Sequence, residues 1–138
     1  MKKTILVSAL SVALLAPVLS QNLTSLTIND LAFRIASAVF SWETTTHNFG
    51  KIPANVPAVK EFSFTNTGEV PLQITKVKGS CGCTVTNYTK ESIAPGKTGM
   101  VKATYNAAKL GAFHKTVTVT ANTEEGPVVL SIKGEVVE

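Results

Sequence analysis

Cys81 and Cys83, separated only by Gly82, are the residues of this chain with the clearest chemical potential, and they are its only cysteines. On an extended strand, residues two apart share a face, with Cα atoms about 6.6–6.8 Å apart. That separation is the upper limit for a disulfide. We therefore expect a bond between the two sulfur atoms to require a pucker of the backbone, which Gly82 permits. A disulfide that closes a 15-residue loop adds roughly 3 kcal/mol to the free energy of unfolding, and this much shorter ring should add well below that.

Three roles are open for this pair. The first is structural, as two small buried residues or a tight local disulfide at the end of a strand. The second is a thiol redox pair, whose disulfide we expect to be strained and readily reduced. The third is a soft-metal site, in which both thiolates and His47 or His114 hold copper(I) or zinc. A single cysteine pair weakens the metal hypothesis, because closed structural zinc sites use four ligands.

The remaining residues do not supply a common catalytic set. His47 and His114 are the only histidines, and Asp30 is the only aspartate. A Ser/His/Asp or Cys/His/Asn nucleophile set cannot be argued from these residues. The glutamates lie mostly on polar strand faces or in turns, where we expect solvated charges. We therefore predict that the protein is not an enzyme, with no catalytic residue, no cofactor and, apart from the soft-metal alternative, no metal.

Residues 1–20 have the composition of an export signal. Lys2 and Lys3 give it a positive start, and residues 5–19 follow without a charge. This apolar run of about 15 residues is shorter than the roughly 20 that a membrane-spanning helix needs. We therefore expect a signal peptide that is removed after Ser20. The mature protein would be exported to the periplasm or the cell exterior, with no membrane span.

The charge that remains argues against nucleic acid as a partner. Removal of the leader lowers the formal charge from +4 to +2, because the leader contains Lys2 and Lys3 and no acidic residue. The other lysines are scattered singly, and Arg34 is the only arginine. A nucleic-acid surface needs clustered basic residues. A protein is the expected partner.

Residues 21–41 are interpreted as a linker of uncertain structure. The small residues at 36–38 also fit a peptidase site, which would place the cut after Ala38. That site lies far downstream of the apolar run, with Asn29, Asp30 and Arg34 between. We prefer the cut after Ser20.

From Ser41 onward, apolar residues recur at every second position. In the clearest run, Phe113, Val117 and Val119 alternate with polar residues. Such alternation is typical of half-buried strands, because successive side chains point to opposite faces of a sheet. Turn residues separate the runs. We predict an all-β fold, a single immunoglobulin-like β-sandwich of about seven strands over residues 42–138. The aromatic residues expected in its core are Trp42, Phe49, Phe62, Phe64, Tyr105 and Phe113.

The chain also resembles a known family through five spaced motifs. They are His47-Asn48-Phe49-Gly50-Lys51-Ile52, Phe62-Ser63-Phe64-Thr65-Asn66-Thr67-Gly68 with Pro71-Leu72, Ser80-Cys81-Gly82-Cys83-Thr84, Ile93-Ala94-Pro95-Gly96 and Gly111-Ala112-Phe113. This order resembles the domain of unknown function 1573 family of exported bacterial proteins. That family is similar to immunoglobulin-like domains of ciliary and centrosomal proteins and of the major sperm protein. The resemblance covers residues 42–138. It implies the fold and export, and it carries over no catalytic residue.

These observations predict an exported, non-catalytic binding or structural module. Sandwiches bind partners through end loops or exposed edges, so we expect contacts in the loops around 50–57, 79–91 and 106–112. The alternative is a thiol redox or soft-metal-handling protein that uses Cys81 and Cys83. The specific partner and the oligomeric state are left open by the sequence.

Overall fold

The computed structural model describes residues 36–138, which form eight strands and no helix. In chain order the strands are β1 (Phe40–Trp42), β2 (Thr46–Pro53), β3 (Ala58–Asn66), β4 (Ile74–Gly79), β5 (Thr84–Tyr88), β6 (Thr98–Tyr105), β7 (Gly111–Ala121) and β8 (Val128–Val137). Within this part of the chain we find no helix with the length and apolarity needed to cross a bilayer. The predicted signal peptide and residues 21–35 of the predicted linker lie outside the described residues.

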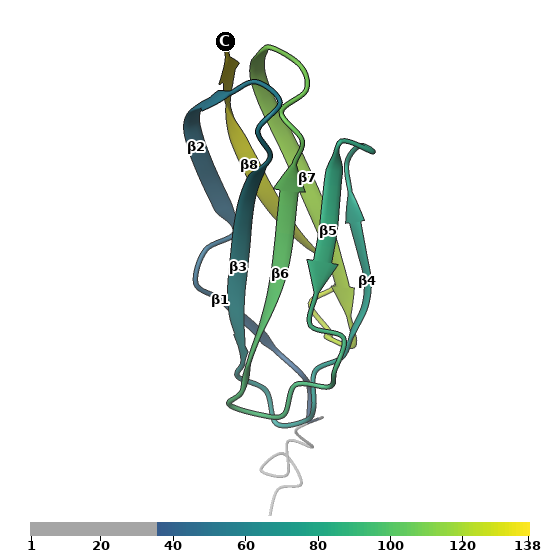
Figure 1. Ribbon diagram of the computed structural model, residues 1–138. Coiled ribbons are helices and arrows are strands. Elements are labelled where there is room, and N and C mark those ends of the chain that lie inside the picture. The colour runs from purple at the N-terminus through teal and green to yellow at the C-terminus, as the bar shows by residue number, and fades with distance from the viewer. Residues whose placement is uncertain (1–35) are drawn as a thin grey trace, which may run out of the picture. The chain divides into compact units, whose positions relative to one another are not determined.

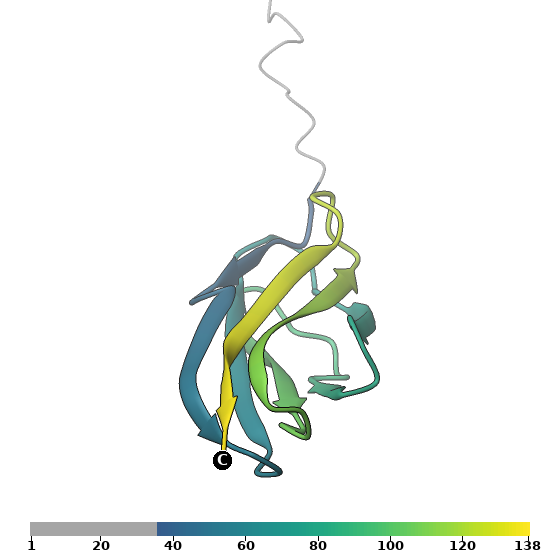
Figure 2. The same cartoon turned by 90° about the horizontal axis from the view of Figure 1, so that it is seen from above.

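The strands form two four-stranded sheets that pack face to face (Figures 1 and 2). The first sheet has the order β1-β3-β6-β5, and all its pairs are antiparallel. The second has the order β2-β8-β7-β4, in which β2 runs parallel to β8 and the other pairs are antiparallel. This arrangement confirms the predicted all-β, immunoglobulin-like sandwich.

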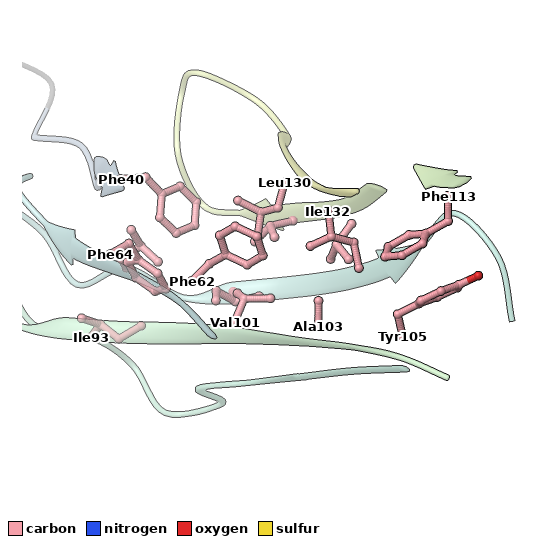
Figure 3. Close-up of a cluster of buried hydrophobic side chains, with 14 of the residues drawn as sticks. Phe40, Phe62, Phe64, Ile93, Val101, Ala103, Tyr105, Phe113, Leu130 and Ile132 are labelled. Carbon is pink, nitrogen blue, oxygen red and sulfur yellow. The ribbon is translucent and has the colours of Figure 1, made fainter. Parts of the chain in front are cut away.

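The core lies between the two sheets, where alternation places every second side chain (Figure 3). Phe62 and Phe64 of β3 have no exposed surface, and Leu130 and Ile132 of β8 are 1% exposed. Full burial of such a side chain contributes about 1.5–3 kcal/mol. Phe113 stacks on Tyr105 with ring centroids 4.2 Å apart, which joins β7 of one sheet to β6 of the other. Val117 and Val119, which were predicted to face inward, are buried as well, and so are Leu72, Ile74, Val101, Ala103 and Val136.

Two of the predicted core aromatics, Trp42 and Phe49, lie at the margin of the core. Both are only partly buried and pack against the core cluster. Trp42 contacts Phe40 and Phe64, with ring centroids 5.0 and 4.8 Å away. Phe49 lies between His47 and Phe113. Their apolar surface therefore extends the core toward β1 and β2.

The sandwich begins before residue 42. Ala38 is 1% exposed, and Phe40 is 8% exposed and belongs to the core. The carbonyl oxygens of Ser37 and Val39 accept hydrogen bonds from the amides of Glu69 and Thr67, at 2.9 and 3.0 Å. Residues 37–41, predicted from the sequence to be part of a linker, belong instead to the folded domain. A three-residue strand is too short to show alternation, so the pattern did not reveal β1.

Asn66 joins β1, β3 and two loops through one buried side chain. It is 0% exposed. Its amide nitrogen donates to the carbonyl oxygens of Val70 and Ile93 at 2.8 and 2.9 Å. Its side-chain oxygen accepts from the amides of Gly68 and Val39 at 3.0 and 3.4 Å. An asparagine amide offers two donor hydrogens and two acceptor lone pairs, and Asn66 uses all four.

Candidate functional site

Cys81, Gly82 and Cys83 lie in the turn between β4 and β5 and not on a strand. β4 is an edge of the second sheet and β5 an edge of the first, so this turn carries the chain from one sheet to the other (Figure 1). The two sulfur atoms are bonded, and the Cα atoms are 5.3 Å apart. That distance is near the middle of the usual range for disulfides. The turn itself therefore supplies the close approach that an extended strand would lack.

Gly82 does not have the role that we expected of it. It is not among the residues with positive φ. A Cβ atom at this position would meet nothing within 4 Å. The expectation that glycine is needed to close the ring is therefore wrong, because it assumed strand geometry. The one-residue spacing also differs from the two-residue spacing of thioredoxin-like motifs, so we do not carry the redox alternative forward.

Hydrogen bonds to backbone groups hold the disulfide turn from both sides. Ser80 donates its amide to the carbonyl oxygen of Thr116 at 2.8 Å, and its hydroxyl oxygen accepts from the Thr116 amide at 3.1 Å. The carbonyl oxygen of Cys83 accepts from the amide of Asn106 at 3.2 Å. These contacts reach β7 and the loop that precedes it. The position of the turn therefore does not depend on the disulfide alone.

We expect the Cys81→Ser, Cys83→Ser double variant to lose only about 1–2 kcal/mol of unfolding free energy, because the closed loop is so short. Gly82→Ala is the matched control and should stay within about 0.5 kcal/mol of the unaltered protein. Denaturant unfolding without reductant measures both. A loss above about 3 kcal/mol in the double variant would show that the disulfide is a major source of stability.

Three loops meet at the end of the sandwich that contains the disulfide (upper end of Figure 1). We call this the disulfide end and define it by residues 54–57, 80–83 and 106–110. The third loop is bonded to both others. Asn106 donates its amide to Cys83, and Asn55 donates its amide to the carbonyl oxygen of Ala107 at 2.9 Å. Parts of the three loop regions in which the sequence predicted partner contacts therefore form one surface.

The backbone of the disulfide end adopts an uncommon conformation at two positions. Asn55 and Ala107 have φ of 60° and 50°, and they are the only non-glycine residues with positive φ in residues 36–138. They are also the two partners of one hydrogen bond. A non-glycine residue in this region costs about 1–3 kcal/mol and persists only where the surrounding structure holds it. The loops are therefore held in one defined shape.

Exposed apolar side chains gather at the same end. Val56 and Leu110 lie in its loops and are 52% and 53% exposed. Val59, the second residue of β3, is 51% exposed. Val129 is the one other large exposed apolar residue in the described part of the chain, and it lies on β8. Apolar surface that collects on folded loops is a common feature of protein contact sites.

The two histidines do not converge with the cysteines. His47 lies on β2, at the edge of the second sheet opposite β4. It is paired with the buried Ile132, whereas His114 is paired with the exposed Lys133. Burial and the Lys60 ammonium lower the pKa of His47. Within residues 36–138 no group of three or more His, Cys, Asp or Glu side chains is placed to hold a metal. The soft-metal set proposed from the sequence is therefore not assembled.

Comparisons with known proteins extend this description. A family model described as a protein of unknown function (DUF1573) matches residues 40–136. A search of curated protein sequences gives no match. Among solved structures, a protein of unknown function from Porphyromonas gingivalis W83 is similar, with a TM-score of 0.65 and 15% identity. That likeness covers 83% of this chain and 51% of the other, so this chain spans about half its length.

Two further solved structures show how widely the fold is used. The ASH/PapD-like domain 7 of human CEP192 has a TM-score of 0.62 and 8% identity, over 74% of this chain and 87% of that one. The VesB protease of Vibrio cholerae has a TM-score of 0.57 and 16% identity, over 72% of this chain and 32% of that one. At such identities the likeness shows a shared sandwich fold. It occurs both in a PapD-like domain and in part of a protease.

Proposed function

From the premise that this chain belongs to the family of proteins of unknown function DUF1573, we propose that it is an exported, non-catalytic binding module. It contacts a protein partner through the disulfide end. The observation that carries this proposal is the convergence of three hydrogen-bonded loops with Val56 and Leu110 exposed among them. Loops at the end of a rigid sandwich can bind a partner without disturbing the core.

The defined shape of these loops favours binding. Loops that must order on contact lose conformational entropy, which opposes association. Here the loop at residues 106–110 is already hydrogen-bonded to both neighbouring loops through Asn55, Asn106 and Cys83. The exposed side chains of Val56 and Leu110 then supply apolar surface whose burial is the driving force.

Export is supported by the leader and by the disulfide. Disulfides persist in oxidising compartments outside the cytosol. The structure also bears on the site of cleavage, because a cut after Ala38 would remove Ser37 and its hydrogen bond to Glu69. A cut after Ser20 keeps these residues. Intact-mass measurement of the exported chain should therefore show an N-terminus at Gln21, and one at Val39 would contradict this assignment.

Replacing Val56 and Leu110 together with serine should weaken partner binding by at least about tenfold, since each buried apolar side chain contributes about 1.5–3 kcal/mol. The measurement is affinity capture from the native cell envelope, with the captured partner then titrated against each purified variant. Val129→Ser is the matched control, because Val129 is as exposed but lies on β8 outside the disulfide end. Equal binding by both variants, or no reproducible partner of the unaltered protein, would contradict the proposal.

A further inference from the structure

The second sheet carries two adjoining hollows at β2, β8 and β7. The first has a volume of about 330 Å³ and is lined by Thr46, His47, Asn48, His114, Ser131 and Lys133. The second, of about 450 Å³, shares Asn48, His114 and Lys133 with the first. No lining residue of either hollow belongs to the three loops of the disulfide end. The hollows are therefore a separate feature of the molecule.

Three polar residues that line both hollows form a row across the sheet. Lys133 of β8 is paired with Asn48 of β2 on one side and with His114 of β7 on the other. All three are exposed, while the preceding residues Ile132 and Phe113 are buried in the core. Paired residues on neighbouring strands share a face. Asn48, Lys133 and His114 therefore project together from the outer face of the sheet.

The uncharged members of this group have hydrogen-bond donors to spare. The side-chain oxygen of Asn48 accepts from the Gly50 amide at 3.0 Å, which leaves both hydrogens of its amide nitrogen free. His114 Nε2 lies 2.6 Å from Ser131 Oγ. If Nε2 carries the hydrogen, it donates to Ser131 Oγ, and the Ser131 hydroxyl hydrogen is free to donate to a ligand. If Nδ1 carries the hydrogen, the Ser131 hydroxyl donates to Nε2, and the Nδ1–H group is free. In either tautomer the pair retains one donor for a ligand.

The first hollow carries a positive charge. Lys133 contributes an ammonium group, and no carboxylate lines this hollow. The one carboxylate of the adjoining hollow, Glu135, is paired with Lys51. Among residues 36–138 the one ion pair joins Lys102 to Glu61 at 2.8 Å, on the other sheet. A third hollow, on that sheet, is lined by Glu43 and Glu61. The first hollow therefore lacks a negatively charged group, which a bound oxyanion would supply.

We propose that the first hollow binds the oxyanion of a small ligand, either a carboxylate or a phosphate monoester. Lys133 supplies the charge, and Asn48 with the His114–Ser131 pair supplies hydrogen bonds to the oxygen atoms. A volume of about 330 Å³ is at the lower end of the range for small-molecule sites. This site does not depend on the protein contact proposed for the disulfide end.

Titration of the purified, isotope-labelled chain with inorganic phosphate and with acetate tests this proposal. Sodium chloride at the same ionic strength is the reference. We expect saturable amide shifts at Asn48, His114 and Lys133 with phosphate, acetate or both, and none with chloride. The anion that binds more tightly identifies the ligand class.

Lys133→Gln should weaken this binding by about tenfold, as expected for loss of one charge-assisted hydrogen bond. Lys76→Gln, at an exposed lysine of β4 in the same sheet, should leave it unchanged. His114→Gln tests the second donor and should also weaken binding while the amide spectrum elsewhere stays the same. Equal shifts with chloride, or equal weakening by Lys133→Gln and Lys76→Gln, would show only general charge attraction and would overturn the proposal.

Discussion

Replacing Asn66 with alanine is expected to lower the free energy of unfolding by about 3 kcal/mol or more, because each buried polar group left without a partner costs about 1–3 kcal/mol. The substitution removes the side-chain amide nitrogen, which donates hydrogen bonds to the carbonyl oxygens of Val70 and Ile93. It also removes the oxygen that accepts from the amides of Val39 and Gly68. The Ile93 oxygen still accepts from the Leu72 amide at 2.8 Å, so the cost falls on the other three backbone partners, at Val39, Gly68 and Val70.

Denaturant unfolding of Asn66→Ala measures this loss directly. Asn87→Ala is a matched control, because Asn87 is exposed and its side-chain oxygen accepts only from the amide of the next residue, Tyr88. The control should stay within about 0.5 kcal/mol of the unaltered protein. If both variants were equally stable, the buried hydrogen bonds of Asn66 could not be what joins β1, β3 and the two loops.

The second large effect is expected at Gly68. A Cβ atom there would lie 2.7 Å from the amide nitrogen of Val39 and 2.8 Å from the Cα atom of Ala38. Both contacts are with backbone, so the segment at residues 37–39 must move away. Its hydrogen bonds with Glu69 and Thr67 would then be lost. We expect Gly68→Ala to cost about 2–4 kcal/mol, from overpacking and the loss of these bonds.

Gly82→Ala is the control for this substitution, since a Cβ atom at Gly82 meets nothing within 4 Å. Thermal or denaturant unfolding compares the two alanine variants. Limited proteolysis adds a local measurement, because displacement of residues 37–39 should open the chain near β1 to cleavage in Gly68→Ala alone. Equal stability and equal protection would contradict the packing of residues 37–41 against the β3–β4 connection.

The two surfaces proposed here differ in their chemistry. The disulfide end exposes apolar side chains on loops of defined shape, which suits a protein partner. The hollow at Lys133 offers charge and hydrogen-bond donors on a regular sheet, which suits a small anion. Val56→Ser with Leu110→Ser tests the first and Lys133→Gln the second. Because the two sets share no residue, the proposals can fail independently.

Most of the core could be predicted because alternation is a local property of the chain. Phe62 and Phe64, or Val117 and Val119, are two residues apart and share a face in any half-buried strand. β1 could not be predicted in this way, because three residues are too few to establish a period. The small residues at 36–38 also fitted a peptidase site, and their contacts with residues 67–69 and Thr123 place them in the domain.

The cysteine pair shows where local reasoning fails. The spacing of Cys81 and Cys83 indicated that a bond could form, but their separation was derived for a strand. The turn between β4 and β5 shortens it to 5.3 Å. Whether the chain is extended or turned at this point depends on the crossing from one sheet to the other, which no local pattern specifies.

The sequence by itself determined most of the buried positions within the longer strands, that the fold consists of strands, and the family to which the chain belongs. It could not show that Asn55, Cys83 and Ala107 meet at one end, or that Asn48, His114 and Lys133 form one row. Those groupings depend on strand order and register. These are decided by how two whole sheets bury their faces together, because residues far apart in sequence become neighbours only when that packing is complete.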